Sequence, residues 1–231
     1  MAQPTQQAEI LAVRNLSPHV RELVVKPLEH PIAFKAGQWV SLHLPIGRKP
    51  PLVRAYTMAE PEQASGELVL AFDRVPGGVG SGYLWSLKQG DRVPVAGPVG
   101  NFVLSEPSAK EPLFIARYTG IVPIRCMIRR LVELKFNRPM TLVYSTPSED
   151  EAIYHKELEA LGRAGRSFAY IRLVGAEVPL RPGSEAEAVI ERLTALVGTR
   201  KDLAPMISGI KAFVRPIRGF FTEMGYERSE E

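Results

Sequence analysis

The chain has 231 residues, of which 45% are hydrophobic, and this is enough for a substantial core in one large domain or two ordinary ones. Its formal charge of +4 is spread along the chain rather than gathered in a stripe, so nucleic-acid binding is not indicated, although the charge would favour an acidic protein partner. A single cysteine, Cys126, excludes an internal disulfide and a cysteine-ligated iron–sulfur cluster within the chain. Any such cluster would belong to a partner.

The N-terminal part reads as short β-rich segments separated by turn residues, which predicts a small antiparallel barrel. Each of the six predicted strands is bounded by Gly, Pro, Asn or Ser. They cover Glu9 to Arg14, Val20 to Lys26, Gln38 to Leu44, Leu52 to Met58, Glu67 to Arg74 and Arg92 to Ala96.

The fourth of these strands carries a cation and an aromatic ring two residues apart. Alternation along a strand sends Arg54 and Tyr56 to one face and Ala55 and Thr57 to the other. A guanidinium binds phosphate bidentately, while a phenol stacks on a ring or bonds a sugar-alcohol hydroxyl. The pair therefore suits a ligand with both a phosphate and a ring, although packing at a strand surface also explains it.

A glycine-rich stretch follows the fifth strand and leads into a predicted helix. Gly78, Val79, Gly80 and Ser81 let the backbone approach a ligand, and the free N–H groups of a first helical turn attract anions. The glycine spacing superficially matches a dinucleotide fingerprint, but the βαβ context of that motif is missing. We interpret the stretch as a second phosphate cradle.

The pattern of predicted secondary structure changes near residue 107. A polar segment with two prolines, residues 105–112, is the predicted linker, and it divides the chain into domains 1–107 and 108–231. Beyond it, strands and helices alternate, which predicts an α/β domain with a parallel sheet. The predicted strands are 113–116, 141–145, 168–174 and 206–208, and the predicted helices are 121–136, 151–161, 185–197 and 211–224, the last interrupted at Pro216.

Three motifs in the first domain together resemble the flavin-binding half of the ferredoxin-NADP reductase family. They are R-x-Y-[ST] at Arg54 to Thr57, G-x-x-S at Gly78 to Ser81, and G-P-x-G-x-F at Gly97 to Phe102, in the family's order. The resemblance implies an FAD site rather than a nucleic-acid or metal site. It places Arg54 on the pyrophosphate, Tyr56 against the ribityl chain or ring, Thr57 near the flavin N5 edge, and Leu70, Ala71 and Phe72 along the ring through their backbone groups.

In the second domain, two segments resemble the family's nicotinamide nucleotide site, at the carboxyl ends of the predicted strands. Thr119, Gly120 and Pro123 fit its G-G-T-G-x-x-P pattern, and Ser208-Gly209 stands where relatives usually have Cys-Gly. The chain departs from this pattern at two positions, because Arg117 and Tyr118 replace its first two glycines. Arg117 would either contribute a cation at a phosphate or block the pocket, and the sequence leaves both readings open. A third departure is Ser208 itself, which replaces the thiol that lies near the hydride-transfer position in relatives.

The resemblance covers nearly the whole chain and implies a reductase that passes electrons between NAD(P)H and a separate one-electron carrier such as ferredoxin. Tyr56, Thr57 and Ser208 would lie nearest the reacting atoms. The alternative is a flavin-binding electron-transfer or sensor module whose nicotinamide site is closed by Arg117 and Tyr118. Neither a leader nor an apolar run of about 18 residues is present in the sequence, so a cytoplasmic protein that does not cross the membrane is expected. The choice between NADH and NADPH, between FAD and FMN, and the oligomeric state stay open.

Overall fold

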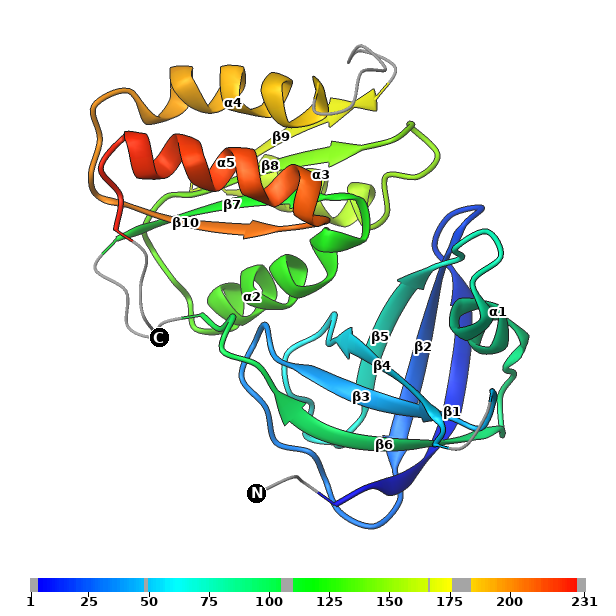
Figure 1. The fold of residues 1–231 in the computed structure, drawn as a ribbon. Coiled ribbons are helices and arrows are strands. Elements are labelled where there is room, and N and C mark those ends of the chain that lie inside the picture. Colours follow the sequence, from blue (N-terminus) through cyan, green and yellow to red (C-terminus); the bar gives the residue numbers. More distant parts are fainter. Residues whose placement is uncertain (1–3, 48–49, 105–109, 166, 176–183, 228–231) are drawn as a thin grey trace. The chain divides into compact units, whose positions relative to one another are not determined.

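The chain folds into two compact units, described here from a computed structural model (Figure 1). One unit comprises Met1–Leu104 and Arg125–Lys135, and the other Ser105–Ile124 and Phe136–Glu231. The structure describes residues 4–47, 50–104, 110–165, 167–175 and 184–227. The predicted domain boundary at residue 107 lies outside the described residues.

The first unit is built on a six-stranded antiparallel sheet, as the turn-punctuated sequence predicts. Its strands occur in the order β4-β3-β6-β1-β2-β5, and their alternating apolar side chains form one core that includes Ile10, Leu42, Leu70 and Val95. The strands are β1 (Gln6–Asn15), β2 (Val20–Pro27), β3 (Trp39–Leu44), β4 (Leu52–Thr57), β5 (Leu68–Asp73) and β6 (Arg92–Val99).

The sheet curls into a barrel because its two outer strands, β4 and β5, meet at one point. Met58, directly after β4, forms an isolated antiparallel bridge with Leu70, and the Ala59 N–H donates to the Val69 carbonyl at 2.7 Å. Over the rest of their length, β4 pairs only with β3 and β5 only with β2 among the described residues. The barrel is therefore joined at one end of this seam and lacks a ladder along the remainder.

Helix α1 (Val79–Ser86) is fixed to the barrel by its tryptophan. The Trp85 ring meets Phe72 of β5 edge-on at 6.3 Å between centroids, and the guanidinium of Arg21 lies 4.3 Å above it. The Arg21 side chain also donates to the Trp85 carbonyl. These contacts hold the C-terminal end of α1 against β2 and β5.

The second unit contains a four-stranded parallel sheet in the order β10-β7-β8-β9 (Figure 1). Alternate residues of β7 and β8, including Leu113, Ile115 and Val143, pack with one face of α4 and α5. From residue 111 onward the elements are β7 (Glu111–Arg117), the 3₁₀ helix η1 (Tyr118–Gly120), α2 (Ile121–Glu133), β8 (Met140–Thr146), α3 (His155–Ala164), β9 (Phe168–Val174), α4 (Ser184–Val197), β10 (Leu203–Ser208) and α5 (Lys211–Glu223). Of these, α2 belongs to the first unit from Arg125 onward.

Proline explains two differences from the predicted elements. β10 begins three residues earlier than predicted and contains Pro205, which is tolerated because β10 is an edge strand. The predicted interruption of the last helix at Pro216 is wrong, since α5 continues through it. Burial of Phe213, Ile217 and Phe221 offsets the roughly 3 kcal/mol that an interior proline costs.

The helix predicted from residue 151 begins later, at His155. Tyr154, which precedes it, has a left-handed backbone with φ of 59°, and this conformation cannot continue a right-handed helix toward the N-terminus. Glu151 is instead buried and accepts a hydrogen bond from Tyr118.

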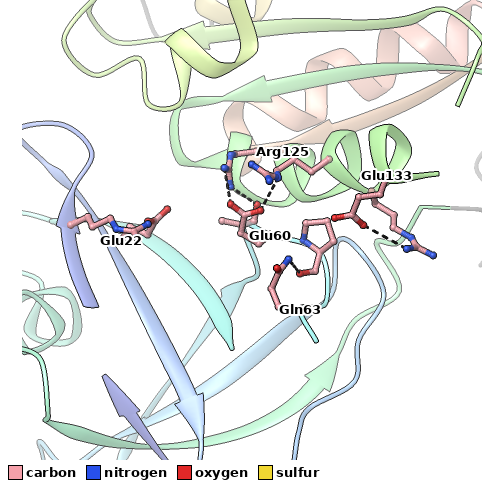
Figure 2. Close-up of polar contacts among 10 residues, drawn as sticks. Glu22, Glu60, Gln63, Arg125 and Glu133 are labelled. Carbon is pink, nitrogen blue, oxygen red and sulfur yellow. Dashed lines mark hydrogen bonds and ion pairs between the residues drawn. The ribbon is translucent and has the colours of Figure 1, made fainter. Parts of the chain in front are cut away.

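A buried ion pair ties the C-terminal part of α2 to the segment after β4, within the first unit (Figure 2). Arg125 contacts Glu60 at 2.8 Å and donates to the Ala59 carbonyl at 2.8 Å. Arg129 contacts the other oxygen of the Glu60 carboxylate at 2.7 Å. The Arg125 side chain is only 6% exposed, whereas that of Arg129 is 42% exposed, so Arg125 is the buried member of this cluster.

Candidate functional site

The structure brings Arg54 and the glycine-rich stretch together. A Cβ placed on Gly80 would lie 3.5 Å from the Cγ of Arg54, so the start of α1 runs directly beside the arginine stem. Arg54 is exposed, and the only hydrogen bond of its side chain among the described residues goes to the Val53 carbonyl. No carboxylate of the described residues neutralises it, and the guanidinium is available for an anion.

The first turn of α1 supplies further positive potential. It contains no acidic side chain, and its N-cap, Gly78, contributes no side-chain hydrogen bond. Val79 is 68% exposed, and its backbone N–H is among those that an α-helix leaves without an internal partner. The Ser81 hydroxyl accepts from the Val75 N–H at 3.1 Å and shapes the turn, and its contact with the flavin phosphates stays a prediction.

Tyr56 lies on β4 with its ring against Phe72, at 5.8 Å between centroids in an edge-on arrangement. Burial raises the pKa of Tyr56 to about 12, so the phenol is neutral at physiological pH. The side chains of Leu70 and Phe72 are both buried in the core, at 1% and 4% exposure. Neither side chain is therefore presented to a ligand.

The backbone groups of β5, unlike these two side chains, can contact a ligand. The Val69 carbonyl points away from β2, toward the bridge that joins β5 to the end of β4. Because backbone groups alternate along an antiparallel strand, the N–H and C=O of Ala71 point to the same side as the Val69 carbonyl, next to the bridge between Met58 and Leu70. Thr57 ends β4 opposite Trp39 and has no hydrogen-bond partner for its hydroxyl among the described residues.

The glycines of the third motif, Gly97 to Phe102, allow close packing between strands. A Cβ on Gly100 would lie 2.7 Å from the Trp39 indole nitrogen, and one on Gly97 would lie 2.9 Å from Val40. Gly100 also has φ of +111°, which side chains rarely adopt. These glycines let β6 approach β3, the strand that pairs with β4.

In the second unit, the two predicted nucleotide segments meet. A Cβ on Gly120 would lie 2.5 Å from the Ser208 carbonyl oxygen and 2.9 Å from the Gly209 nitrogen. A Cβ on Gly209 would lie 3.0 Å from the Cβ of Arg117. Glycine at both positions allows the carboxyl ends of β7 and β10 to lie in direct contact.

Arg117 and Tyr118 are each engaged with a carboxylate of the same unit. Arg117 Nε contacts Glu185 at 2.5 Å, and Glu185 also accepts from the Ser145 hydroxyl at 2.6 Å. The Tyr118 hydroxyl donates to Glu151 at 2.9 Å, and its backbone has φ of 47°, a conformation that costs a non-glycine residue about 1 to 2 kcal/mol. Arg117 is thus neutralised internally rather than presented as a free cation.

Thr119 lies in η1, and Pro123 is buried in the first turn of α2. The end of β8 adds an unsatisfied group at the same edge of the sheet. The Thr146 hydroxyl is fully buried and has no hydrogen-bond partner among the described residues, which is uncommon for a buried polar atom.

Sequence reasoning missed Arg172, which the sheet register brings to this edge. It lies on β9 opposite Tyr144, and its guanidinium pairs with Glu149 in the segment after β8. The position of Arg172 depends on the pairing of β8 with β9, because Tyr144 and Arg172 are 28 residues apart in the chain. A charged residue inside an otherwise apolar strand is the one signal in the sequence that could have indicated it.

Other reactive side chains have structural partners. His155 Nδ1 lies 3.1 Å from the Tyr170 hydroxyl, while Glu159 pairs with Arg163, and the described residues contain no cluster of three or more metal-ligating side chains. Burial raises the pKa of Cys126 to about 12, so its thiol is unreactive near neutral pH. None of the described helices is long and apolar enough to span a bilayer.

Comparison with known protein families gives a match for each of the two parts of the chain. Residues 7–104 match the oxidoreductase FAD-binding domain, and residues 114–217 match the oxidoreductase NAD-binding domain. Ferredoxin–NADP reductase B of Sorangium cellulosum is 34% identical over 218 residues, which cover 92% of this chain and 89% of that protein. The chain belongs to the ferredoxin–NADP reductase family.

Relatives within this family include larger proteins. The toluate 1,2-dioxygenase electron transfer component of Pseudomonas putida is 30% identical over 90% of this chain, which spans only 63% of that protein. Among solved structures, the ferredoxin NADP+ reductase from Neisseria gonorrhoeae with bound FAD and NADP has a TM-score of 0.81 at 22% identity and covers 98% of this chain and 94% of its own. This likeness confirms the two-part fold expected of the ferredoxin–NADP reductase family.

The contact between Gly120 and Ser208 gives a direct test of the second unit's packing. Gly120→Ala should lower the free energy of unfolding by about 1 to 3 kcal/mol, because the new methyl group would overlap the Ser208 carbonyl. Gly82→Ala in α1 is the control, since nothing lies within 4 Å of a Cβ there, and it should be neutral or slightly stabilising. Denaturant unfolding followed by circular dichroism measures both, and equal stabilities would contradict the packing.

Proposed function

We propose that this protein is an FAD-dependent reductase that passes electrons between NAD(P)H and a separate one-electron carrier such as ferredoxin. The observation that carries the proposal is the match to both an FAD-binding and an NAD-binding family in one chain, together with a ferredoxin–NADP reductase that aligns across 92% of it. The 231 residues contain a single cysteine and cannot ligate an iron–sulfur cluster, so we place the one-electron carrier outside these residues.

The residues of the first unit fit FAD. Arg54 and the backbone N–H groups at the start of α1, in the stretch Gly78 to Ser81, would hold the diphosphate, since both present positive potential at one place. Tyr56 and Thr57 would line the ring on one side of the open seam, and the backbone of Ala71 would meet it on the other. When bound, FAD supplies the exchange between two-electron hydride transfer and one-electron transfer.

The residues of the second unit fit a nicotinamide nucleotide at the junction of Gly120 with Ser208 and Gly209. Thr119, Gly120 and Pro123 would shape its backbone cradle, and Ser208 would lie nearest the reacting ring. Arg117 would position Glu185 and Ser145 rather than bind phosphate, because its guanidinium already contacts the Glu185 carboxylate. We place the division between the two functions near residue 107.

The test is anaerobic stopped-flow absorbance of the FAD-loaded protein mixed with NADH and, separately, with NADPH. We expect the flavin bands to bleach within seconds, and the faster nucleotide names the physiological donor. Flavin that resists both nucleotides yet is reduced by dithionite would contradict the proposal. That outcome would favour the closed module in which Arg117 and Tyr118 block the site, for which no comparison offers support.

A further inference from the structure

Arg125 holds two neighbouring residues of the segment after β4 with two different nitrogens of one guanidinium. Its Nη1 donates to the Ala59 carbonyl at 2.8 Å, and its Nη2 contacts the Glu60 carboxylate at 2.8 Å (Figure 2). A guanidinium is planar and its donors have a fixed spacing. The backbone of one residue and the side chain of the next are therefore held in a single geometry.

The strength of an ion pair does not by itself account for this buried guanidinium. The Arg125 side chain is only 6% exposed, and removing a charge from water costs free energy that a buried ion pair often barely offsets. The Glu60 carboxylate also has a second, more accessible partner in Arg129, at 2.7 Å. Arg125 adds a bond to a backbone carbonyl, and the position of that carbonyl indicates what the buried charge does.

Ala59 is the residue at which the two outer strands of the barrel meet. Its N–H donates to the Val69 carbonyl at 2.7 Å, next to the isolated bridge between Met58 and Leu70. Both backbone groups of Ala59 are thus bonded to other elements, the N–H to β5 and the carbonyl to α2. Arg125 consequently holds the closed end of the seam between β4 and β5.

The closed end of the seam determines how the two proposed flavin-lining positions face each other. Because Met58 pairs with Leu70 in an antiparallel sense, Thr57 lies opposite Ala71 in the same register. The described residues of β4 and β5 form no ladder along the rest of the seam. A displacement of Ala59 would therefore change the spacing of Thr57 and Ala71 directly.

We propose that Arg125 is a positioning residue for the flavin, which fixes the closed end of the seam through the Ala59 carbonyl. The inference rests on the proposed function for the place of the FAD ring beside Thr57 and the Ala71 backbone. Polar groups at the ring tune the redox chemistry of a flavin, so a displaced seam changes the relative affinity for reduced and oxidised FAD. A residue that only stabilised the fold would leave this ratio unchanged in folded protein saturated with FAD.

The test compares three variants, each saturated with FAD at a temperature at which circular dichroism shows it to be folded. Arg125→Met removes both contacts of the guanidinium. Arg129→Met removes a positive charge from the same carboxylate and leaves the bond to Ala59 in place. Arg125→Lys keeps the charge but replaces the planar fork by a compact ammonium, and it also serves if Arg125→Met does not fold.

The first measurement is the midpoint potential of the bound flavin, obtained by equilibration with a reference dye. We expect Arg125→Met to weaken the binding of reduced FAD relative to oxidised FAD by about tenfold or more, because the electron-rich reduced ring loses more from misplaced donors. This ratio corresponds to a fall of about 30 mV or more for a two-electron couple. Arg125→Lys should change the ratio in the same direction by about threefold or more, and Arg129→Met by less than about twofold.

The second measurement is amide hydrogen exchange in the protein without FAD. The Ala59 amide, relative to the Ile10 amide in the barrel core, should exchange about tenfold faster in Arg125→Met and within about twofold of the unchanged protein in Arg129→Met. The ratio of the two amides separates a local opening of the seam from a general loss of stability, which would accelerate both.

A midpoint potential equal to that of the unchanged protein in Arg125→Met or in Arg125→Lys would overturn the proposal, the latter because charge rather than the fork would then explain the effect. Equal changes in Arg125→Met and Arg129→Met would overturn it as well, and so would equal acceleration of the Ala59 and Ile10 amides. A failure of NADH and NADPH to reduce the flavin of the unchanged protein would count against the proposed function alone, since neither measurement involves a nicotinamide nucleotide.

Discussion

Replacement of Arg54 by alanine should weaken flavin binding by about 10- to 100-fold. The guanidinium has no carboxylate partner among the described residues and lies beside Gly80 at the start of α1. Loss of a charge-assisted contact to a phosphate costs roughly 1.5 to 3 kcal/mol, which corresponds to that range of affinity. Titration of the apoprotein with FAD, followed by quenching of flavin fluorescence, measures the change.

Arg92→Ala is the matched control for this measurement. Arg92 is an exposed arginine of β6 in the same unit, and it has no ion pair among the described residues, so its loss changes the net charge equally. We expect it to leave flavin affinity within about twofold. Equal affinities of the two variants would remove Arg54 from the flavin site.

Arg125→Met should lower the stability of the first unit by about 1 to 3 kcal/mol. The substitution removes a buried guanidinium from Glu60 and leaves the Ala59 carbonyl without that donor. Glu60 keeps its contact with Arg129 in this variant, so the loss is smaller than that for a buried charge left without any partner. Both tryptophans of the chain, Trp39 and Trp85, lie in this unit, so tryptophan fluorescence during urea unfolding reports on it selectively.

Arg129→Met provides the comparison, since this arginine contacts the same carboxylate while 42% exposed. Solvent screening should limit its effect to less than about 1 kcal/mol. A double variant, Arg125→Met with Glu60→Leu, should recover part of the loss because it also removes the partly buried carboxylate that Arg125→Met leaves with Arg129 alone. Similar losses of stability for Arg125→Met and Arg129→Met would show that burial does not determine how much each arginine contributes.

The architecture could be predicted from the sequence because its signals are local. Period-two alternation and turn residues gave six antiparallel strands, and the change to alternating strands and helices gave the parallel sheet. The errors occurred where packing across the chain decided the outcome. Pro216 interrupts a helix by propensity, yet three buried side chains keep α5 continuous. The late start of α3 depends on the backbone of Tyr154, which no pattern in the sequence indicates.

The candidate site was predictable as a set of positions but not as a set of contacts. Motif order placed Arg54, Gly80, Gly120 and Ser208, and the structure brings them together in two pairs, one in each unit. The sequence could not decide whether Arg117 binds a phosphate or blocks the pocket, because its partner Glu185 lies 68 residues away. Arg172 escaped notice for the same reason, since strand register rather than spacing along the chain brings it to the sheet edge.

The seam of the barrel has a consequence for the protein without its cofactor. Along most of β4 and β5, the described residues leave two strand edges without a ladder between them, and these edges carry the exposed residues Val53, Arg54 and Ala55. Unpaired strand edges are templates for pairing with another chain. A ligand lodged in the seam would therefore also shield the chain from self-association, so that loss of FAD would promote aggregation as well as abolish electron transfer.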